Sequence, residues 1–285
     1  MAATILSLAE ERYRDSQSST FPLPTSPSEP LPGALATILS HKSCRAFLRD
    51  KPLPAGTLET LLTAAQSGST SSLYQTWDVV AIQEFEHRSK VATLAGNQDF
   101  IRQAPLFLAF CPNLRRLDNL SKQYEQQPAR ALENMDMFIM SVLDAAIAGQ
   151  TVAIAAESLG LGVCYVGGLR NNAEQVCELL NLPPLTWGVF GMAIGYADPE
   201  NRLSGKQIKP RLPMREIVHM ERWSEEGQKE NVASYDKSLG AFYVDESKFG
   251  REGWGEFVAG KVAPRDQDGR ERIRAVLEKQ GFKLE

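Results

Sequence analysis

The chain has 285 residues, of which 43% are hydrophobic and 23% are charged, as in a globular protein with one large or two small domains. Its formal net charge of −4 argues against a general nucleic-acid-binding surface. The four cysteines have no CxxC or CxxH spacing and the three histidines are scattered, so we expect no metal site. We therefore expect reduced cysteines, a cytoplasmic location, and neither a membrane nor a nucleic acid as partner.

The N-terminal segment differs from the rest of the chain. Residues 4–15 have helical spacing, and their acidic residues fit neither a secretory signal nor a mitochondrial presequence. Residues 16–33 contain five prolines among serines, which predicts a linker. We expect three parts: an N-terminal helix with its Pro/Ser-rich linker (1–33), a main domain (34–220), and a C-terminal helical extension packed on the same domain (221–285).

The main domain is predicted to alternate helices with strands. Helices are expected at 34–40, 57–66 (with Thr57 as N-cap), 132–160 and 173–182, and strands at 77–82, 105–111, 162–166 and 187–196. This alternation predicts a layered α+β or α/β domain. Residues 132–160 are too apolar for a surface helix and too often interrupted by polar residues for a membrane span. They indicate either a central core helix or the core of a dimer. In the extension, amphipathic helices are expected at 235–243 and 268–280.

Two basic clusters stand almost 170 residues apart in this acidic chain. The first is the run His41-Lys-Ser-Cys-Arg45, and the second contains Lys209 and Arg211. Arginine, lysine and backbone N–H groups are the donors that hold a phosphate. Pro210 favours an extended backbone before it, so Lys209 and Arg211 should share a face. Either cluster alone is typical of a protein surface, but together they indicate a mononucleotide site.

Small polar residues and glycines complete the candidate site. The run 67–72 (Ser-Gly-Ser-Thr-Ser-Ser) follows a predicted helix and, taken alone, indicates only a loop. Gly160 and Gly162 precede a predicted strand, whereas a dinucleotide-binding fingerprint follows one, so we reject that interpretation. Gly167 and Gly168 follow the strand, where a bare backbone can approach a flat ring closely.

The motifs, in this order, resemble the FMN-dependent nitroreductase/flavin reductase superfamily. The resemblance is greatest to oxygen-insensitive NADPH nitroreductases and NADPH-flavin oxidoreductases, and it is carried by residues 41–45, 69–72, 96–98, 155–162, 165–171, 190–191 and 209–213. It implies an α+β, nitroreductase-like three-layer fold with a central, mostly antiparallel sheet flanked by helices and a C-terminal extension. It also implies a homodimer with two FMN sites at the interface.

The resemblance further implies which residues bind FMN. Phosphate and ribityl oxygens would be held by His41, Lys42, Ser43, Lys209 and Arg211. The ribityl chain or the ring would be contacted by Thr70, Ser71 and Ser72, and the ring's polar edge by Gln98. One side of the ring would be lined by Tyr165, Val166, Gly167 and Gly168. Arg45 would lie at the pyrimidine edge and act electrostatically. No side chain would act as a nucleophile or general base, because the cofactor carries the chemistry.

The implied reaction is ping-pong transfer of hydride from NAD(P)H through bound FMN to nitroaromatics, quinones or flavins. Lys42 stands where close relatives generally have arginine. The stretch 244–251 corresponds to the region where relatives bind the NADPH 2′-phosphate. It offers Lys248 and Arg251 beside two acidic residues, so the hydride donor can be either NADPH or NADH. Two alternatives are a specialised reductase of one secondary metabolite and a non-catalytic flavin-binding module.

Overall fold

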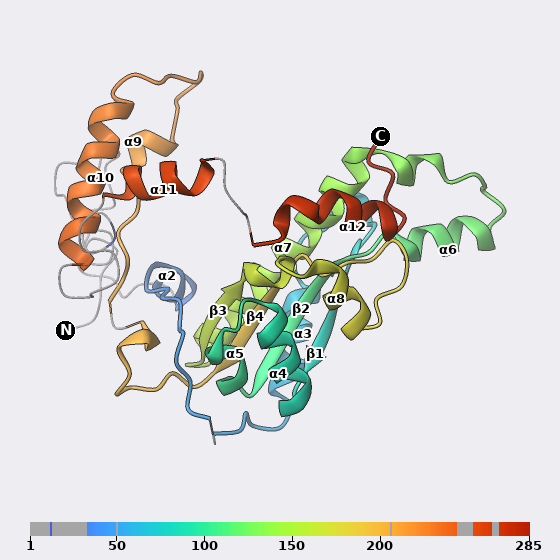
Figure 1. Cartoon of the computed structure of the whole chain (residues 1–285), viewed down its shortest axis with the longest axis horizontal. Coiled ribbons are helices and arrows are strands. Elements are labelled where there is room, and N and C mark those ends of the chain that lie inside the picture. The colour runs from blue at the N-terminus through green and yellow to red at the C-terminus, as the bar shows by residue number, and fades with distance from the viewer. Residues whose placement is uncertain (1–11, 13–32, 50, 206, 244–252, 264–267) are drawn as a thin grey trace. The chain divides into compact units, whose positions relative to one another are not determined.

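The computed structural model describes residues 12, 33–49, 51–205, 207–243, 253–263 and 268–285. The chain divides into two compact units (Figure 1). One, which we call the small unit, comprises residues 1–42 and 206–265, and the other, the core unit, comprises 43–205 and 266–285. The predicted helix at 4–15 and the linker at 16–33 lie outside the described residues, apart from Arg12 and Gly33. The predicted domain limits at residues 33 and 220 stay predictions.

The core unit is built on a four-stranded sheet in which every neighbouring pair is antiparallel. The strands are β1 (Trp77–Ile82), β2 (Leu106–Pro112), β3 (Gly162–Val166) and β4 (Phe190–Gly195), in the order β1-β2-β4-β3. Phe110 of β2 pairs with Phe190 of β4, and Val163 of β3 pairs with Ile194 of β4. The predicted antiparallel sheet is therefore confirmed.

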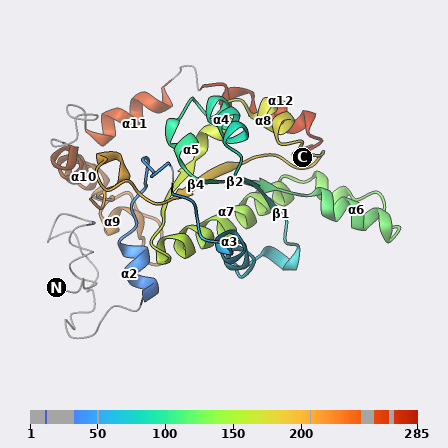
Figure 2. The same cartoon turned by 90° about the horizontal axis from the view of Figure 1, so that it is seen from below.

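Helices cover both faces of this sheet. The helices of the core unit are α3 (Thr57–Gln66), α4 (Phe85–Leu94), α5 (Asp99–Gln103), α6 (Arg115–Gln123), α7 (Met135–Ser158), α8 (Ala173–Leu179) and α12 (Ile273–Lys279). Figure 2 shows α3 and α7 against one face and α4, α5 and α8 against the other. Side chains of β2 alternate accordingly: Leu106 and Leu108 pack with the α7 side, whereas Phe107 and Ala109 pack with the α4 side. This is the predicted three-layer arrangement.

The long helix α7 is the central helix of the core unit. It runs from Met135 to Ser158, slightly shorter than predicted, and follows a short 3₁₀ helix at Arg130–Glu133. Its length and mean hydropathy of 1.7 would suffice for a membrane span. However, it packs on β2 and α3 and buries residues along its whole length, including the charged Asp144. Core packing therefore accounts for the apolar residues on its buried side.

Several predicted boundaries and elements needed correction. Thr57 is not the N-cap of α3 but its first residue; the cap is Gly56, whose φ of 81° suits glycine. Strand β4 begins at Phe190, because the preceding residues form a loop whose Val189 N–H donates to the Phe110 carbonyl (3.0 Å). Helices α4, α5 and α6 were missed, since their sequences are short and rich in charged residues.

The small unit is helical in the part that the structure describes. Its helices are α2 (Gly33–Leu39), α9 (Met214–Ile217), α10 (Gln228–Tyr243) and α11 (Trp254–Val262). Helix α10 starts seven residues before the predicted helix at 235–243, and α11 was not predicted. The two helices pack through Tyr235 and Trp254, whose rings meet edge to face with centroids 5.4 Å apart. The predicted helix at 268–280 divides into a 3₁₀ turn at Arg270–Arg272 followed by α12.

Candidate functional site

The glycine pair after β3 lies against Gln98. Gly167 and Gly168 open a 3₁₀ turn, Gly167–Arg170, immediately after the strand. A Cβ atom on Gly168 would lie 2.4 Å from the Ala95 carbonyl oxygen and 2.7 Å from Gln98 Nε2. The Gln98 amide donates to that same carbonyl (2.7 Å). Only glycine permits this approach, and it brings together two residues predicted to border one ring.

Two guanidinium groups lie beside the same turn. A Cβ atom on Gly167 would be 3.4 Å from Arg170 Nη2, while Arg170 Nη1 donates to the Val189 carbonyl (2.6 Å). Burial lowers the pKa of Arg170, and the nearby charge of Arg270 lowers it further. Arg270 Nε donates to Asn171 Oδ1 (2.9 Å). The sequence predicted no role for either arginine: Arg170 lies in the motif 165–171 but was given no contact there, and Arg270 stands 100 residues further along the chain, outside the motifs.

Tyr165 connects β3 to α7, whereas the neighbouring Val166 faces the core. The Tyr165 hydroxyl donates to Gln150 Oε1 of α7 (3.2 Å), and its ring lies 5.3 Å from the ring of Phe190. Tyr165 is 37% exposed, whereas Val166 is 1% exposed and packs in the core. Only the backbone of Val166 could therefore contact a ligand.

The serine run forms a tight loop that is hydrogen-bonded to α7. Ser71–Leu73 is a 3₁₀ turn in which Ser72 has a left-handed φ of 49°. Ser71 N–H donates to Asp144 Oδ1 of α7 (2.9 Å). Because Asp144 and Gln150 are fewer than two helical turns apart, α7 brings the serine loop and Tyr165 to one part of the core unit.

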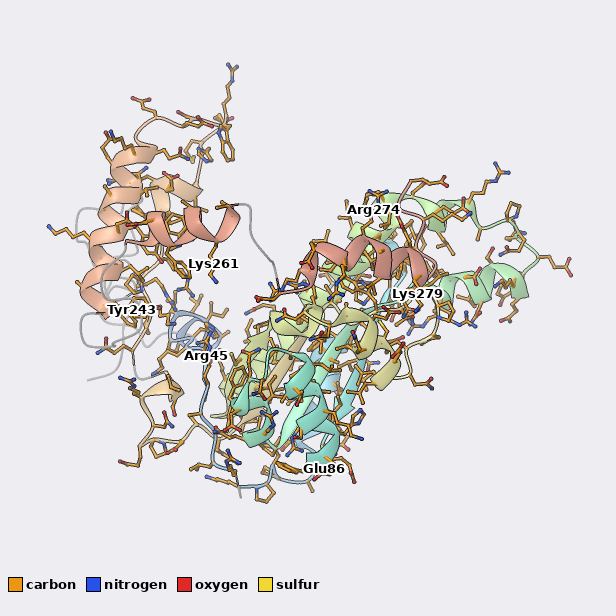
Figure 3. The ribbon with its side chains drawn as sticks, in the orientation of Figure 1. Arg45, Glu86, Tyr243, Lys261, Arg274 and Lys279 are labelled. Atoms are coloured by element: carbon orange, nitrogen blue, oxygen red, sulfur yellow. The ribbon has the colours of Figure 1, made fainter. Side chains whose placement is uncertain are left out.

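The residues Ser43 to Arg45 run beside the start of β3. Ser43 forms a parallel bridge with Val163, and Cys44 N–H donates to the Val163 carbonyl (2.8 Å). The side chain of Arg45 is exposed (Figure 3), while Cys44 is buried, and burial raises the pKa of its thiol to about 11. At ~3.3 Å per strand residue, Val163 and Gly167 are roughly 13 Å apart. Ser43 and the glycine pair therefore stand at opposite ends of β3.

The remaining predicted cations lie on two segments of the small unit, and Arg12 is hydrogen-bonded to both segments. Arg12 Nη2 donates to the carbonyls of Leu39 (3.0 Å) and His41 (3.3 Å), and Arg12 Nη1 donates to the carbonyl of Lys209 (3.2 Å). In return, Arg211 N–H donates to the Arg12 carbonyl (3.0 Å). The structure thus brings the basic run around His41 to the segment Lys209–Arg211. No sequence pattern identified Arg12.

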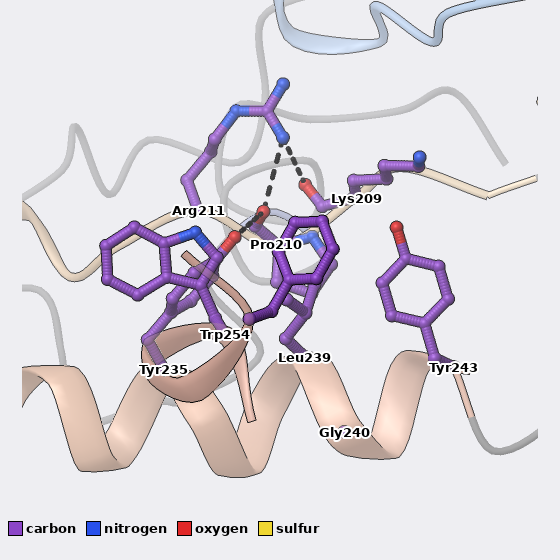
Figure 4. Close-up of a pocket in the computed structure, with 9 residues that line it drawn as sticks. Lys209, Pro210, Arg211, Tyr235, Leu239, Gly240, Tyr243 and Trp254 are labelled. Carbon is purple, nitrogen blue, oxygen red and sulfur yellow. Dashed lines mark hydrogen bonds between the residues drawn. The ribbon is translucent and has the colours of Figure 1, made fainter. Parts of the chain in front are cut away.

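An aromatic pocket adjoins Lys209 and Arg211 (Figure 4). It has a volume of about 150 Å³ and is lined by Lys209, Pro210, Arg211, Tyr235, Leu239, Gly240, Tyr243, Trp254 and Phe257. Arg211 Nη1 donates to its own neighbours' carbonyls, Lys209 O (3.4 Å) and Pro210 O (3.2 Å). Lys209 Nζ lies 5.6 Å from the centre of the Tyr243 ring. The pocket is smaller than usual ligand sites of about 300–1,000 Å³, so it is not a site for a whole nucleotide. The stretch 244–251 lies outside the described residues.

Comparison with known proteins identifies the family. A model described as "Nitroreductase family" matches residues 38–96 and 83–196, and one described as "Nitroreductase family, C-terminal domain" matches residues 209–285. A Bacillus subtilis protein named FMN reductase (NADPH) is 37% identical over 220 residues, 76% of this chain and 86% of that protein. The NADPH-flavin oxidoreductase of Vibrio harveyi is 33% identical over 80% of this chain and 90% of its own length.

Solved structures agree with these matches. The structure of B. megaterium NfrA2 superposes with a TM-score of 0.81 at 32% identity, covering 90% of this chain and all of that one. The V. harveyi NADPH:FMN oxidoreductase complexed with NAD+ gives a TM-score of 0.78 at 31% identity, covering 89% of this chain and all of that one. With its antiparallel sheet, its glycine pair and matches over both parts of its length, the chain belongs to the nitroreductase family.

Proposed function

We propose that this protein is an NAD(P)H-dependent FMN oxidoreductase that passes hydride from the nicotinamide through bound FMN to nitroaromatics, quinones or flavins. The observation that carries the proposal is the close approach of Gly168 to Ala95 and Gln98 at the end of β3. It leaves a side-chain-free backbone beside an amide, which suits the polar edge of a flat ring. The names of the relatives, FMN reductase and NADPH-flavin oxidoreductase, support the same cofactors.

The donor chemistry of the predicted residues fits FMN. Lys209 and Arg211 offer cations for a phosphate, and both lie on one segment of the small unit. Serine and threonine hydroxyls in the loop 70–72 suit ribityl oxygens, as does Ser43. Arg12 donates to the carbonyl of His41, immediately before Lys42. The side chains of His41 and Lys42 are proposed as further hydrogen-bond donors to the phosphate. These roles, like those of Tyr165 and the backbone of Val166, are proposals.

FMN, when bound, supplies the ring system that accepts a hydride and passes the electrons on. The residues of this chain would bind and orient that ring rather than react covalently. Arg45, with its guanidinium exposed, would stabilise negative charge that develops at the pyrimidine edge. Gln98, whose amide is already fixed on Ala95, would contact the polar edge of the ring. Gly167 and Gly168 would keep the approach to the ring free of side chains.

The direct test is an anaerobic absorbance spectrum of purified protein before and after addition of NADPH and, separately, NADH. We expect a yellow protein whose flavin absorbance is bleached, and the two rates give the coenzyme preference. A yellow protein that stays oxidised with both coenzymes would favour a non-catalytic flavin-binding module. A colourless protein that cannot be loaded with FMN would contradict the assignment.

We also propose that the protein is a homodimer that associates through α7. Met135, Ile139, Leu143 and Ile147 recur every fourth residue and are 38–53% exposed; we call them the α7 stripe. Residues four apart lie on one helix face, so the stripe is a continuous apolar surface. Such a surface, on the outer side of a core helix, is typical of a subunit interface. A second copy of this chain is the occupant that we propose.

Sedimentation equilibrium tests the dimer. Leu143→Glu places a charge on the most exposed position of the α7 stripe, 53% exposed, and should produce monomers. Glu86→Lys, a charge change on α4 on the other side of the sheet, is a control that should leave the dimer intact. Unchanged association of Leu143→Glu would contradict the proposed interface.

A cytoplasmic location is proposed on the basis of the cysteines. None of the four cysteines forms a disulfide, and all four are buried: Cys44, Cys111, Cys164 and Cys177. Cysteines that form no disulfide are typical of a reducing compartment. Fractionation of cells that express the full chain would test the proposal, which recovery outside the cytoplasm would contradict.

A further inference from the structure

The side chain of Asp144 is a fully buried carboxylate in the middle of α7. It has no exposed surface, and no ion pair involves it among the described residues. A buried carboxylate is costly unless its oxygens accept hydrogen bonds. Here Oδ1 accepts from Ser71 N–H (2.9 Å), and Oδ2 accepts from the Thr76 N–H (3.0 Å) and hydroxyl (2.9 Å). All three donors come from one loop, which we call the serine loop, residues 70–76.

The serine loop has an unusual backbone that the carboxylate holds at both ends. Ser72, Leu73 and Gln75 all have positive φ angles, of 49°, 59° and 50°, although none is glycine. L-residues rarely adopt this conformation, and they keep it only where the surroundings enforce it. Asp144 binds Ser71 just before the three residues and Thr76 just after them. One side chain therefore fixes the start and the end of the strained turn.

The strained conformation does not serve core packing. Leu73 is 84% exposed and Tyr74 is 44% exposed, so the turn buries little apolar surface. Ser72 is exposed as well. Backbone strain of this kind collects at ligand sites, where it orients groups before the ligand arrives. The turn is therefore shaped for what it presents outward.

We propose that Asp144 is a positioning residue that sets the serine loop in the geometry that binds FMN, an inference that rests on the proposed function. The carboxylate does not touch the cofactor; it acts through Ser71 and Thr76. Asparagine cannot replace it, because an amide offers one acceptor oxygen and places its NH₂ against an N–H donor. Gly68 also faces α7, where a Cβ atom at this position would lie 3.2 Å from both Ile147 and Thr151, but this close approach makes no such demand on charge.

The experiment compares Asp144→Asn with two other variants of the full chain. Thr76→Val removes only the hydroxyl bond to Asp144 and keeps the N–H bond. Ser141→Ala is the matched control, since Ser141 is also fully buried on α7 but its hydroxyl bonds only to its own helix, at Phe138 O (2.7 Å). The measurements are the FMN dissociation constant of the apoprotein, the melting temperature, and the visible circular dichroism of flavin at saturating FMN.

We expect Asp144→Asn to weaken FMN binding by about tenfold or more and to change the flavin circular dichroism at saturation. Thr76→Val should weaken binding less, and Ser141→Ala should stay within about twofold of the parent. Asp144→Asn with the parent's FMN affinity and flavin spectrum would overturn the inference. If Asp144→Asn does not fold, Thr76→Val with unchanged affinity and spectrum overturns it instead. A parent protein that binds no FMN would instead reject the proposed function.

Discussion

The two glycines after β3 allow the placement of the flavin to be tested separately from protein stability. In Gly168→Ala, the new methyl group would lie 2.4 Å from the Ala95 carbonyl oxygen and 3.1 Å from its carbonyl carbon. Both atoms are backbone, so the segment 95–98 or the glycine turn has to move. Overpacking of this kind costs about 1–3 kcal/mol. In Gly167→Ala, the nearest atom is Arg170 Nη2 at 3.4 Å, the end of a flexible side chain. The folded apoprotein should tolerate that change.

The expected results follow from this difference. Gly168→Ala should lower the melting temperature of the apoprotein by a few degrees, at about 2–4 °C per kcal/mol for a chain of this size. Gly167→Ala should leave the apoprotein melting temperature nearly unchanged. If Gly167 faces the flavin ring, its new methyl group should nevertheless weaken FMN binding by about tenfold, since the ring loses its close approach. Differential scanning fluorimetry of apoprotein and fluorescence titration with FMN measure the two effects. Gly167→Ala with full FMN affinity would refute the placement of the ring on this turn.

Three further predictions concern the cations and a buried thiol. Arg211→Ala should weaken FMN binding by about 1.5–3 kcal/mol through loss of a charge-assisted contact, and full flavin occupancy after dilution would contradict its role. Arg12→Ala should weaken FMN binding by about tenfold, because three carbonyl contacts of the phosphate-binding segments are lost, whereas Arg274→Ala, on the exposed surface of α12, should have no effect in the same titration. Burial, with a smaller contribution from the nearby Cys164, raises the pKa of Cys44 from 9.0 to about 11, so the folded state keeps a proton that the unfolded state releases. The free energy of unfolding should therefore fall by about 1–3 kcal/mol between pH 9 and 11, and urea titrations of Cys44→Ala should lack that part of the fall.

The sheet was predictable because its signals are local. The strand at 77–82 was predicted with the bounds of β1, and the segment 162–166 with those of β3, since short apolar runs between turn residues are typical of strands. Helix α4 was missed because its apolar spacing is weak and its buried face includes Arg88, which donates to the Pro105 carbonyl (3.5 Å). A buried arginine on a charged helix follows from tertiary packing, not from the periodicity of the segment.

The candidate site could be predicted only where its residues belong to a continuous sequence motif. The motifs around Ser43, Gln98 and Gly168 lie on continuous segments, and a resemblance can be recognised from them. Asp144 lies 68 residues from Thr76, and two of its three hydrogen-bond donors are backbone N–H groups, which exist at almost every residue. An aspartate in an apolar helix gives no sequence signal of which loop it holds. Arg12, similarly, donates to the backbone carbonyls of Leu39, His41 and Lys209, and because every residue has a carbonyl oxygen the sequence does not indicate these partners.

Helix α7 explains why one segment suggested both a core helix and a dimer core. Its inner side packs on the sheet and places the buried Asp144 against the serine loop, while the exposed Gln150 accepts a hydrogen bond from Tyr165. Its outer side carries the α7 stripe, including Leu143, the residue next to Asp144. A helix is rigid over this distance, so a partner subunit that packs on the α7 stripe also fixes the residues of α7 that hold the serine loop. If dimerisation through α7 raises the affinity for FMN in this way, linkage requires that FMN raises the affinity for the partner by the same factor. The FMN affinity of Leu143→Glu should then fall together with its dimerisation.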